Sequence, residues 1–193
     1  METKSTTDSE RRRRVLDAAL VTFARFGFRK TSMDEIARVA DISRQGLYFY
    51  FRNKDDLFRE TVQKWFDDGL EAVESKLSQD DVSIDDRLIS AMDAWFGRQV
   101  ELLGNDTTDL IERSNALVGD MFFRCGAAFQ TKLEAAIDKS ELTREAERRG
   151  LASADIARLL YRCALGWKQA RLTRAEFLKQ MTIAVRLICR SGS

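Results

Sequence analysis

Residues 43–54, with the sequence SRQGLYFYFRNK, bring four consecutive aromatic residues together with basic and amide side chains. The guanidinium of Arg44 and the amide of Gln45 have hydrogen-bonding groups that suit guanine and adenine edges respectively. The hydroxyls of Tyr48 and Tyr50 can donate hydrogen bonds to phosphate oxygens. Contact with base edges and with a phosphate backbone is therefore the chemistry that this stretch could perform.

Four consecutive aromatic residues on a helix point in directions about 100° apart, so they cannot all be buried. We expect Leu47 and Phe51 to pack inward, while Tyr48 and Tyr50 keep a hydroxyl outside. For Phe49 three roles stay open, namely contact with a thymine methyl group, contact with a sugar, and plain packing.

Other kinds of chemistry lack their usual residues. The chain has no histidine, which is the commonest general base and transition-metal ligand. It also has no phosphate-binding glycine loop, nucleophile elbow or CxxC pair. We therefore expect no enzymatic activity, no metal site and no cofactor.

The cysteines and the hydropathy favour a cytoplasmic protein. Cys125, Cys163 and Cys189 are far apart in the sequence, which favours small buried hydrophobes over disulfides, with redox sensing as the alternative. No apolar run is long enough to span a bilayer, and METKSTTDSERRRR lacks the apolar centre of a signal peptide. We expect no contact with a membrane.

The composition predicts a globular, helical protein with an uneven charge distribution. The 193 residues include no proline and only 10 glycines, which favours long helices. The net charge is +1, but residues 10–54 hold 11 basic against 5 acidic residues, whereas residues 61–193 hold 19 against 21. Such a basic head on a neutral body is typical of DNA binding, although a basic patch alone could equally be a solvated face.

The elements that would position the polar side chains follow from apolar spacing and capping residues. Apolar residues at three- and four-residue spacing predict a helix over residues 10–25, which Gly27 ends. Ser32 followed by Glu35 is a capping box that begins a helix of about two turns. After a break, Ser43 can cap a second short helix. Together they form a helix-turn-helix pattern, whose second helix lies in the major groove.

The stretch VLDAALVTFARFGFRKTSMDEIARVADISRQGLYFYFRNKDDLF, residues 15–58, resembles the DNA-binding domain of the TetR family of transcriptional regulators. The shared features are F-x-x-x-G-F, then T-S-x-x-x-I-A-x-x-A, then S-x-x-x-L-Y-x-Y-F. The resemblance implies base and backbone contacts by Arg44, Gln45, Gly46, Tyr48 and Tyr50, and phosphate contacts by Lys54 and by Thr31 or Ser32. Phe49 completes the set of candidate DNA-binding residues.

Two positions depart from the family pattern, and one run has two interpretations. Asp41 stands where the family usually has glycine, and we expect the turn to survive because aspartate tolerates a left-handed backbone better than most residues. Tyr50 stands where histidine is common; tyrosine can also donate to phosphate but does not titrate near neutral pH. The run Arg11–Arg14 is either a frayed, solvated end or a tail that adds phosphate contacts.

Residues 55–193 predict a second helical domain after a DNA-binding domain of residues 1–54. Apolar periodicity predicts helices over about 54–77, 83–103, 107–118, 120–138, 153–172 and 173–189, which makes about nine in an all-α chain. The last two are apolar over a wide stripe, which a second copy of the chain would bury. The resemblance implies the same homodimer through the last two helices, with two heads on a near-palindromic double-stranded DNA operator.

The resemblance also implies a small-molecule pocket in the second domain. The candidate lining residues are Trp95, Phe96, Phe122, Phe123, Phe129 and Trp167, although large apolar residues are more often plain core. The ligand would be largely apolar, and no polar anchor stands out. The preferred hypothesis is a dimeric repressor that a small-molecule ligand releases from its operator. The alternatives are a helical small-molecule-binding protein of the same fold without DNA binding, and a ligand-independent or activating regulator.

Overall fold

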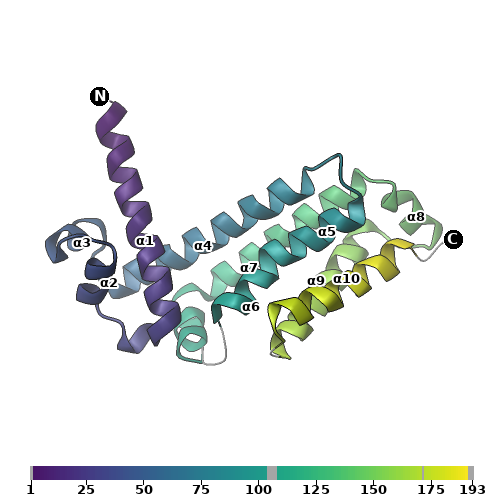
Figure 1. The fold of residues 1–193 in the computed structure, drawn as a ribbon. Helices are drawn as coiled ribbons and strands as arrows, with labels where there is room; N and C mark the ends of the chain where they lie inside the picture. The colour runs from purple at the N-terminus through teal and green to yellow at the C-terminus, as the bar shows by residue number, and fades with distance from the viewer. Residues whose placement is uncertain (1, 104–107, 171, 191–193) are drawn as a thin grey trace. The chain divides into compact units, whose positions relative to one another are not determined.

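The computed structural model describes the backbone of residues 2–103, 108–170 and 172–190, and the side chains of residues 8–101, 117–170 and 172–189. Every regular element in these ranges is helical, which confirms the all-α prediction (Figure 1). The elements are α1 (Glu2–Lys30), α2 (Met33–Val39), α3 (Arg44–Tyr50), α4 (Lys54–Leu77), α5 (Ile84–Met92), a π-helical segment (Asp93–Gly97), α6 (Arg98–Leu103), α7 (Thr108–Asp138), α8 (Leu142–Arg148), α9 (Ser153–Gln169) and α10 (Arg174–Arg190).

Side-chain caps begin α2, α3 and α4. The side-chain oxygens of Ser32, Ser43 and Asn53 each accept a hydrogen bond from the backbone N–H three residues later, at 3.2, 3.0 and 2.8 Å. Such a cap satisfies a backbone donor that has no partner within the first turn of the helix. The caps at Ser32 and Ser43 confirm the sequence prediction.

Two left-handed positions separate the first helices. Gly27 interrupts α1 with φ 80° and ψ 165°, close to where the sequence predicts the helix to end. Asp41 has a φ of 54° in the turn between α2 and α3. The expectation that aspartate supports this turn in place of glycine is therefore confirmed.

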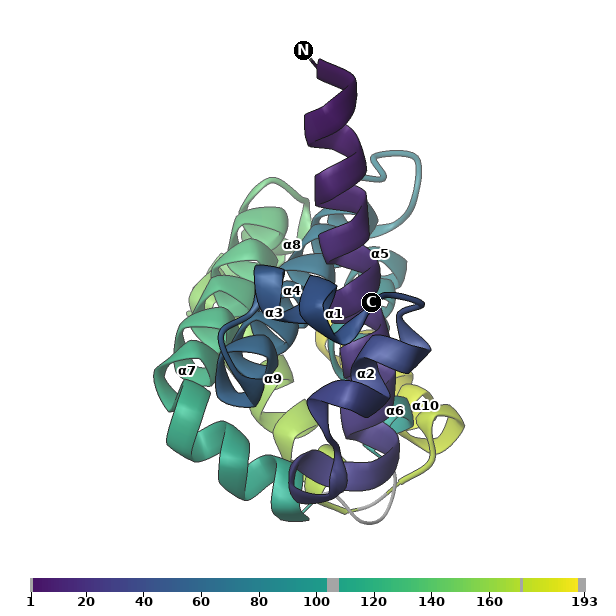
Figure 2. The same cartoon turned by 90° about the vertical axis from the view of Figure 1, so that its left-hand side faces the viewer.

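Helices α1, α2 and α3 lie against one another around an aromatic core (Figures 1 and 2). The ring of Phe23 stacks on Phe28 with centroids 5.7 Å apart, and both rings meet the edge of Phe58 at 5.1 Å. Leu47 and Phe51 are fully buried beneath α3. Their predicted inward packing is confirmed, and it fixes which face of α3 points outward.

Two elements extend the predicted helices. Helix α1 begins at Glu2 instead of near residue 10, and it includes the run Arg11–Arg14. The run is therefore helical, but Arg11, Arg13 and Arg14 are exposed, so a solvated face and added phosphate contacts both stay open. Helix α8 occupies part of the polar stretch before Leu151, where Leu142 and Ala146 are buried one helical turn apart.

Two irregularities occur where the sequence predicts a different pattern. The expected break after residue 118 lies inside α7 as a kink at Val118, with φ −139° and ψ 20°. The π-helical segment joins α5 to α6 where a single regular helix is expected. It buries Trp95, Phe96 and Gly97.

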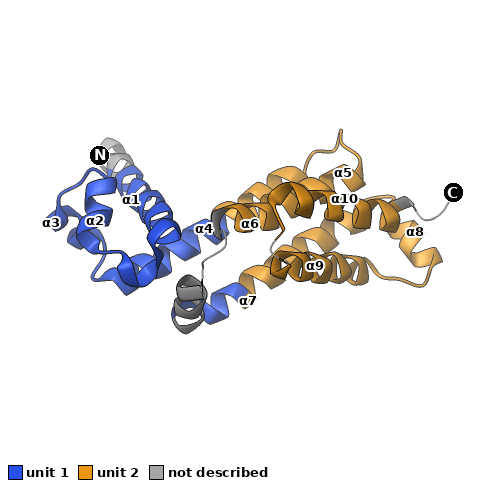
Figure 3. Ribbon diagram, turned by 60° about the horizontal axis from the view of Figure 1, so that its bottom comes forward, with its two compact units in different colours: residues 1–67, 106–122 blue, residues 68–105, 123–193 orange. Residues whose placement is uncertain are grey.

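The chain divides into two compact units (Figure 3). Unit 1 comprises residues 1–67 and 106–122, and unit 2 comprises residues 68–105 and 123–193. Helices α4 and α7 contribute residues to both units. The sequence predicts a boundary between residues 54 and 55, with a DNA-binding domain before it and a second helical domain after it. Whether either segment folds independently stays a prediction.

In unit 2, α10 packs against α5 and α9. Its fully buried side chains are Phe177, Met181 and Val185, which follow at four-residue spacing and form the core-facing stripe. Over the described residues, none of the helices has both the length and the apolar character needed to cross a membrane.

Candidate nucleic-acid interface

The outer face of α3 carries residues that the sequence predicts to meet DNA. Phe49 is 78% exposed and Tyr48 is 43% exposed, whereas Leu47, next to them in the chain, is fully buried. Arg44 and Gln45, in the first turn of α3, are exposed as well. The helix therefore presents polar groups at its N-terminal end and aromatic rings farther along.

The position of Phe49 excludes one of the three roles that the sequence left open for this residue. Its exposed ring meets only the edge of Tyr50 among the described rings, with centroids 5.3 Å apart. Plain packing in the core is therefore excluded. An exposed phenyl ring on this helix is suited to a thymine methyl group or a sugar.

The absence of a side chain at Gly46 leaves room for the capping hydroxyl of Ser43. Its N–H donates to Oγ of Ser43, and a Cβ placed on Gly46 would lie 3.2 Å from that oxygen. A side chain at this position would crowd the capping hydroxyl. The predicted contact of Gly46 with DNA stays a prediction, and only backbone atoms of this residue could make it.

Arg44 is held by a carboxylate from the neighbouring helix α2. Its Nη1 donates to Oδ2 of Asp34 at 3.1 Å, and its Nε lies 3.1 Å from Oδ1. The guanidinium also lies 5.7 Å from the centroid of the Tyr48 ring. The side chains of Arg44 and Asp34 are 67% and 59% exposed, so the pair contributes little to stability and mainly sets where the guanidinium lies.

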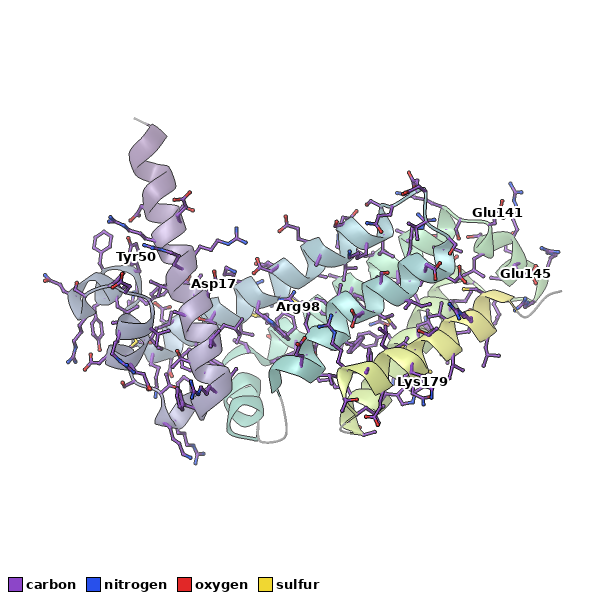
Figure 4. All side chains as sticks on the ribbon, viewed as in Figure 1. Asp17, Tyr50, Arg98, Glu141, Glu145 and Lys179 are labelled. Atoms are coloured by element: carbon purple, nitrogen blue, oxygen red, sulfur yellow. The ribbon has the colours of Figure 1, made fainter. Side chains whose placement is uncertain are left out.

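The early turns of α1 engage the end of α3. The hydroxyl of Tyr50, which is labelled in Figure 4, donates to Oδ1 of Asp8 at 2.6 Å. This hydrogen bond, together with partial burial and the negative charge of Asp8, raises the pKa of Tyr50 above its usual value. Arg12, one turn farther along α1, pairs with Glu60 and lies 5.3 Å from the centroid of the Phe51 ring. The Tyr50 hydroxyl, which was predicted to meet a phosphate, therefore has an intramolecular acceptor.

Lys54 has a structural task that the sequence did not predict. Its Nζ donates to the main-chain oxygens of Phe28 and Thr31, each at 2.9 Å, and it lies 4.4 Å from the centroid of the Phe28 ring. The ammonium thus connects the first turn of α4 to the end of α1. Because an ammonium has three N–H groups, one donor beyond these two remains for a phosphate.

Thr31 and Ser32 were alternative phosphate contacts, and the structure separates them. Thr31 is 2% exposed, and its hydroxyl donates to the main-chain oxygen of Gly27 at 2.7 Å. The Thr31 hydroxyl is therefore directed into the protein, and a phosphate contact at this residue stays a prediction for its backbone N–H. Ser32 is exposed and stays a candidate.

Three of the six predicted ligand-lining residues meet in unit 2. The rings of Trp95 and Phe129 stack with centroids 5.1 Å apart, and Phe96 meets Phe129 edge-on at 5.8 Å. Tyr161 adjoins both phenyl rings, at 5.6 Å from Phe96 and 6.2 Å from Phe129. Trp95, Phe96 and Phe129 are at most 5% exposed, as expected of a packed core.

The other three predicted lining residues lie elsewhere. Phe122 belongs to unit 1 and meets the edge of Phe66 at 5.0 Å. Phe123 is 82% exposed, which corrects its expected lining role because its ring faces solvent. Trp167 is half-buried.

Two clefts in unit 2 have other linings. One of about 290 Å³ lies between α8, α9 and α10 and includes Leu142, Ile156 and Leu187. Another of about 440 Å³ lies between α4, α5 and α7 and includes Arg87 and Lys132. None of the six predicted ligand-lining residues lines either of these two clefts. The sequence analysis therefore did not identify the residues around them.

Some residues around these sites were missed. Asp8 and Asp34 carry no signal in the sequence, because an exposed acid on a helix has no mark that identifies its partner. Lys168 did have a signal, since it follows Leu160 and Ala164 at four-residue spacing on the buried stripe of α9. Its Nζ donates to Oε1 of the buried Gln99 at 2.6 Å, and burial lowers the pKa of Lys168.

Metal and disulfide chemistry find no support in the described residues. No group of three or more cysteine, histidine, aspartate or glutamate side chains there could hold a metal ion. Cys125 is buried, Cys163 and Cys189 are half-buried, and none of the three forms a disulfide in the described part of the chain.

Comparison with known proteins assigns the helix-turn-helix to a family. The family model described as bacterial regulatory proteins, tetR family, matches residues 15–61, which include all of α2 and α3. Residues 15–61 therefore match the TetR family. Two proteins similar to part of this chain are HTH-type transcriptional regulators. AcrR of Shigella flexneri is 43% identical over 51 residues, which are 26% of this chain and 24% of AcrR. RutR of Escherichia coli (strain K12) is 36% identical over 59 residues, which are 31% of this chain and 28% of RutR.

These sequence matches span only about a quarter of each relative's length. Similarity in fold to solved structures covers a larger part of the chain than these sequence matches do. A TetR-family transcriptional regulator from Streptomyces coelicolor has a structure similar to 93% of this chain and to 80% of its own, with a TM-score of 0.63 and 24% identity. The fold of the TetR-family regulators therefore covers most of the chain, well beyond the share that matches AcrR or RutR in sequence.

Proposed function

We propose that this chain is a sequence-specific, DNA-binding regulator of transcription that places α3 in the major groove. The observation that carries the proposal is the division of α3 into a buried face with Leu47 and an exposed face with Arg44, Gln45 and Phe49. The guanidinium and the amide in the first turn suit guanine and adenine edges. The buried face fixes the helix against α1 and α2, so the reading groups stand on a rigid support.

The phosphate contacts in this proposal come from residues around α3. Ser32 and Tyr48 are exposed, and the third N–H of the Lys54 ammonium is available beside them. Tyr50 can donate to a phosphate once its hydroxyl leaves Asp8. The helical run Arg11–Arg14 adds positive charge on the same unit and would strengthen the attraction to DNA at low salt.

The proposal includes a homodimer formed through α9 and α10. Three large aliphatic side chains on these helices are exposed in the single chain: Leu159 at 52%, Ile183 at 47% and Leu187 at 64%. A second copy of the chain would remove these side chains from water. A symmetric pair of heads would then recognise a near-palindromic operator with two half-sites.

The regulator would act as a repressor by blocking polymerase at its operator, and a small molecule would release it. A ligand can do this only if it binds more tightly to the conformation with low affinity for DNA. The aromatic cluster of Trp95, Phe96 and Phe129 favours a largely apolar ligand, provided that the cluster opens to admit it.

A footprint of the purified protein on the DNA that flanks its own gene tests the proposal. We expect protection of a near-palindromic site at nanomolar protein, and less transcript from that promoter in a reconstituted reaction. Increased transcription would assign activation instead of repression. Absence of a protected site there and among randomly fragmented genomic DNA would contradict the DNA-binding function itself.

A further inference from the structure

Asp34 is the acidic partner of the residue best suited to read a base. Its carboxylate accepts a hydrogen bond from Nη1 of Arg44 and lies 3.1 Å from Nε. The contact joins the first turn of α2 to the first turn of α3. Arg44 carries five N–H donors, so the edge of the guanidinium that faces away from Asp34 stays available to a base.

We propose that Asp34 is a specificity-determining residue, which acts by positioning Arg44 for one base pair in each half-site. The inference rests on the proposed function and adds a residue that touches no base itself. Two physical effects support it. A guanidinium anchored on one edge loses less side-chain freedom when its other edge meets guanine O6 and N7.

The second effect concerns DNA of the wrong sequence. A carboxylate beside Arg44 reduces the attraction of this guanidinium for phosphates, which every sequence offers equally. Contact with a guanine offsets this reduction at the correct site, whereas no such contact forms at other sites. Specificity is a difference of two affinities, so a group that weakens the competing complex raises it.

The experiment uses the full-length protein and an operator obtained by selection from random DNA. Dissociation constants are measured by fluorescence anisotropy for that operator and for a shuffled duplex of equal length. The variant Asp34→Asn removes the charge and keeps the size of the side chain. Its matched control is Glu35→Gln, which removes one charge from the same turn of α2 and has no partner on α3 among the described contacts. Urea denaturation confirms that both variants fold, and Asp34→Ala repeats the test with another side chain.

We expect Asp34→Asn to lower the ratio of the two affinities at least about fivefold, the lower end of what one good base contact discriminates. Glu35→Gln should leave this ratio within about twofold, because it changes only the general attraction to DNA. In the background of Arg44→Ala, Asp34→Asn should have no further effect on the ratio, since the residue that it positions is gone.

Two results would overturn the inference. One is a ratio that falls no more for Asp34→Asn than for Glu35→Gln. The other is an equal fall with and without Arg44, which would assign Asp34 a role independent of that residue. A wild-type protein that binds the selected and the shuffled duplex equally would be a different failure, because it would contradict the proposed DNA-reading function and the inference with it.

Discussion

Lys54 lies at the start of α4, and its ammonium donates to the main-chain oxygen of Thr31, 23 residues earlier, at 2.9 Å. A second hydrogen bond of the same length reaches the main-chain oxygen of Phe28. Hydrogen bonds from a charged donor are about twice as strong as neutral ones. The residue expected to meet a phosphate is therefore also a connection between α1 and α4.

The variant Lys54→Met keeps the length of the side chain and removes both hydrogen bonds. We expect it to lower the free energy of unfolding by about 1–3 kcal/mol, because two partly buried carbonyl oxygens lose a charged donor. Urea denaturation with an unchanged m-value measures this loss. On folded protein, the salt dependence of DNA binding should also become shallower by about one unit. Lys30→Met, at an exposed lysine of α1, is the control, and an equal effect of both variants would contradict the double role of Lys54.

The turn between α2 and α3 gives a second test, because Asp41 has a φ of 54°. A residue with a Cβ is strained at such a positive φ unless its side chain stabilises the turn, whereas glycine adopts this backbone conformation without strain. We expect Asp41→Ala to destabilise the protein by about 1 kcal/mol and Asp41→Gly to be close to neutral. Thermal unfolding of the two variants decides this point. Equal midpoints for alanine and glycine would show that the left-handed backbone carries no strain.

The three helix caps could be predicted from the sequence because each depends on residues three positions apart. The burial of Thr31 beside the exposed Ser32 could not, since the two residues are of similar type and only packing against α1 distinguishes them. The contact of Asp34 with Arg44 likewise depends on how α2 packs on α3. Periodicity predicts that two helices have apolar faces, but it does not predict which polar side chains meet.

The aromatic residues of the second half show the same limit. Phe123 is 82% exposed and Phe129 is fully buried, although both lie on α7. Residues six positions apart on a helix point in directions about 120° apart, so spacing predicts that they occupy different faces. It does not predict which face is the core. Composition alone favoured both as pocket residues, and only the structure separates them.

The hydrogen bond between Tyr50 and Asp8 predicts a pH dependence. The carboxylate stabilises the neutral phenol, so the folded-state pKa of Tyr50 lies above its unfolded value of about 10. This stabilisation is fully present below the unfolded pKa and is lost as the pH rises through the folded pKa.

A difference titration of phenolate absorbance, wild type minus Tyr50→Phe, isolates this residue. We expect Asp8→Asn to shift the midpoint of Tyr50 downward, toward the usual value, because the acceptor loses its charge. Asp17→Asn, on the same helix, should leave the midpoint where it is. A midpoint that does not respond to Asp8→Asn would contradict the contact between the two helices.

The proposed dimer predicts a specific sensitivity at Leu187, which is 64% exposed on α10. We expect Leu187→Glu to weaken self-association at least about tenfold, because moving a charge from water into an apolar interface is costly. Sedimentation velocity over a range of concentrations measures this change. Val21→Glu, at a similarly exposed residue of α1, is the control and should not affect association. Wild-type protein that sediments as a monomer at micromolar concentration would contradict the dimer.

The most direct test of the account compares Arg44→Ala with Arg38→Ala for binding to the selected operator and to a shuffled duplex. Both arginines are exposed in the helix-turn-helix, but only Arg44 belongs to the first turn of α3. We expect Arg44→Ala to lose about 1–3 kcal/mol of binding free energy at the operator and much less on shuffled DNA, with relaxed preference at one base pair of each half-site. Arg38→Ala should weaken both complexes to a similar degree. An equal loss on both duplexes for Arg44→Ala would contradict the conclusion that α3 reads the DNA sequence.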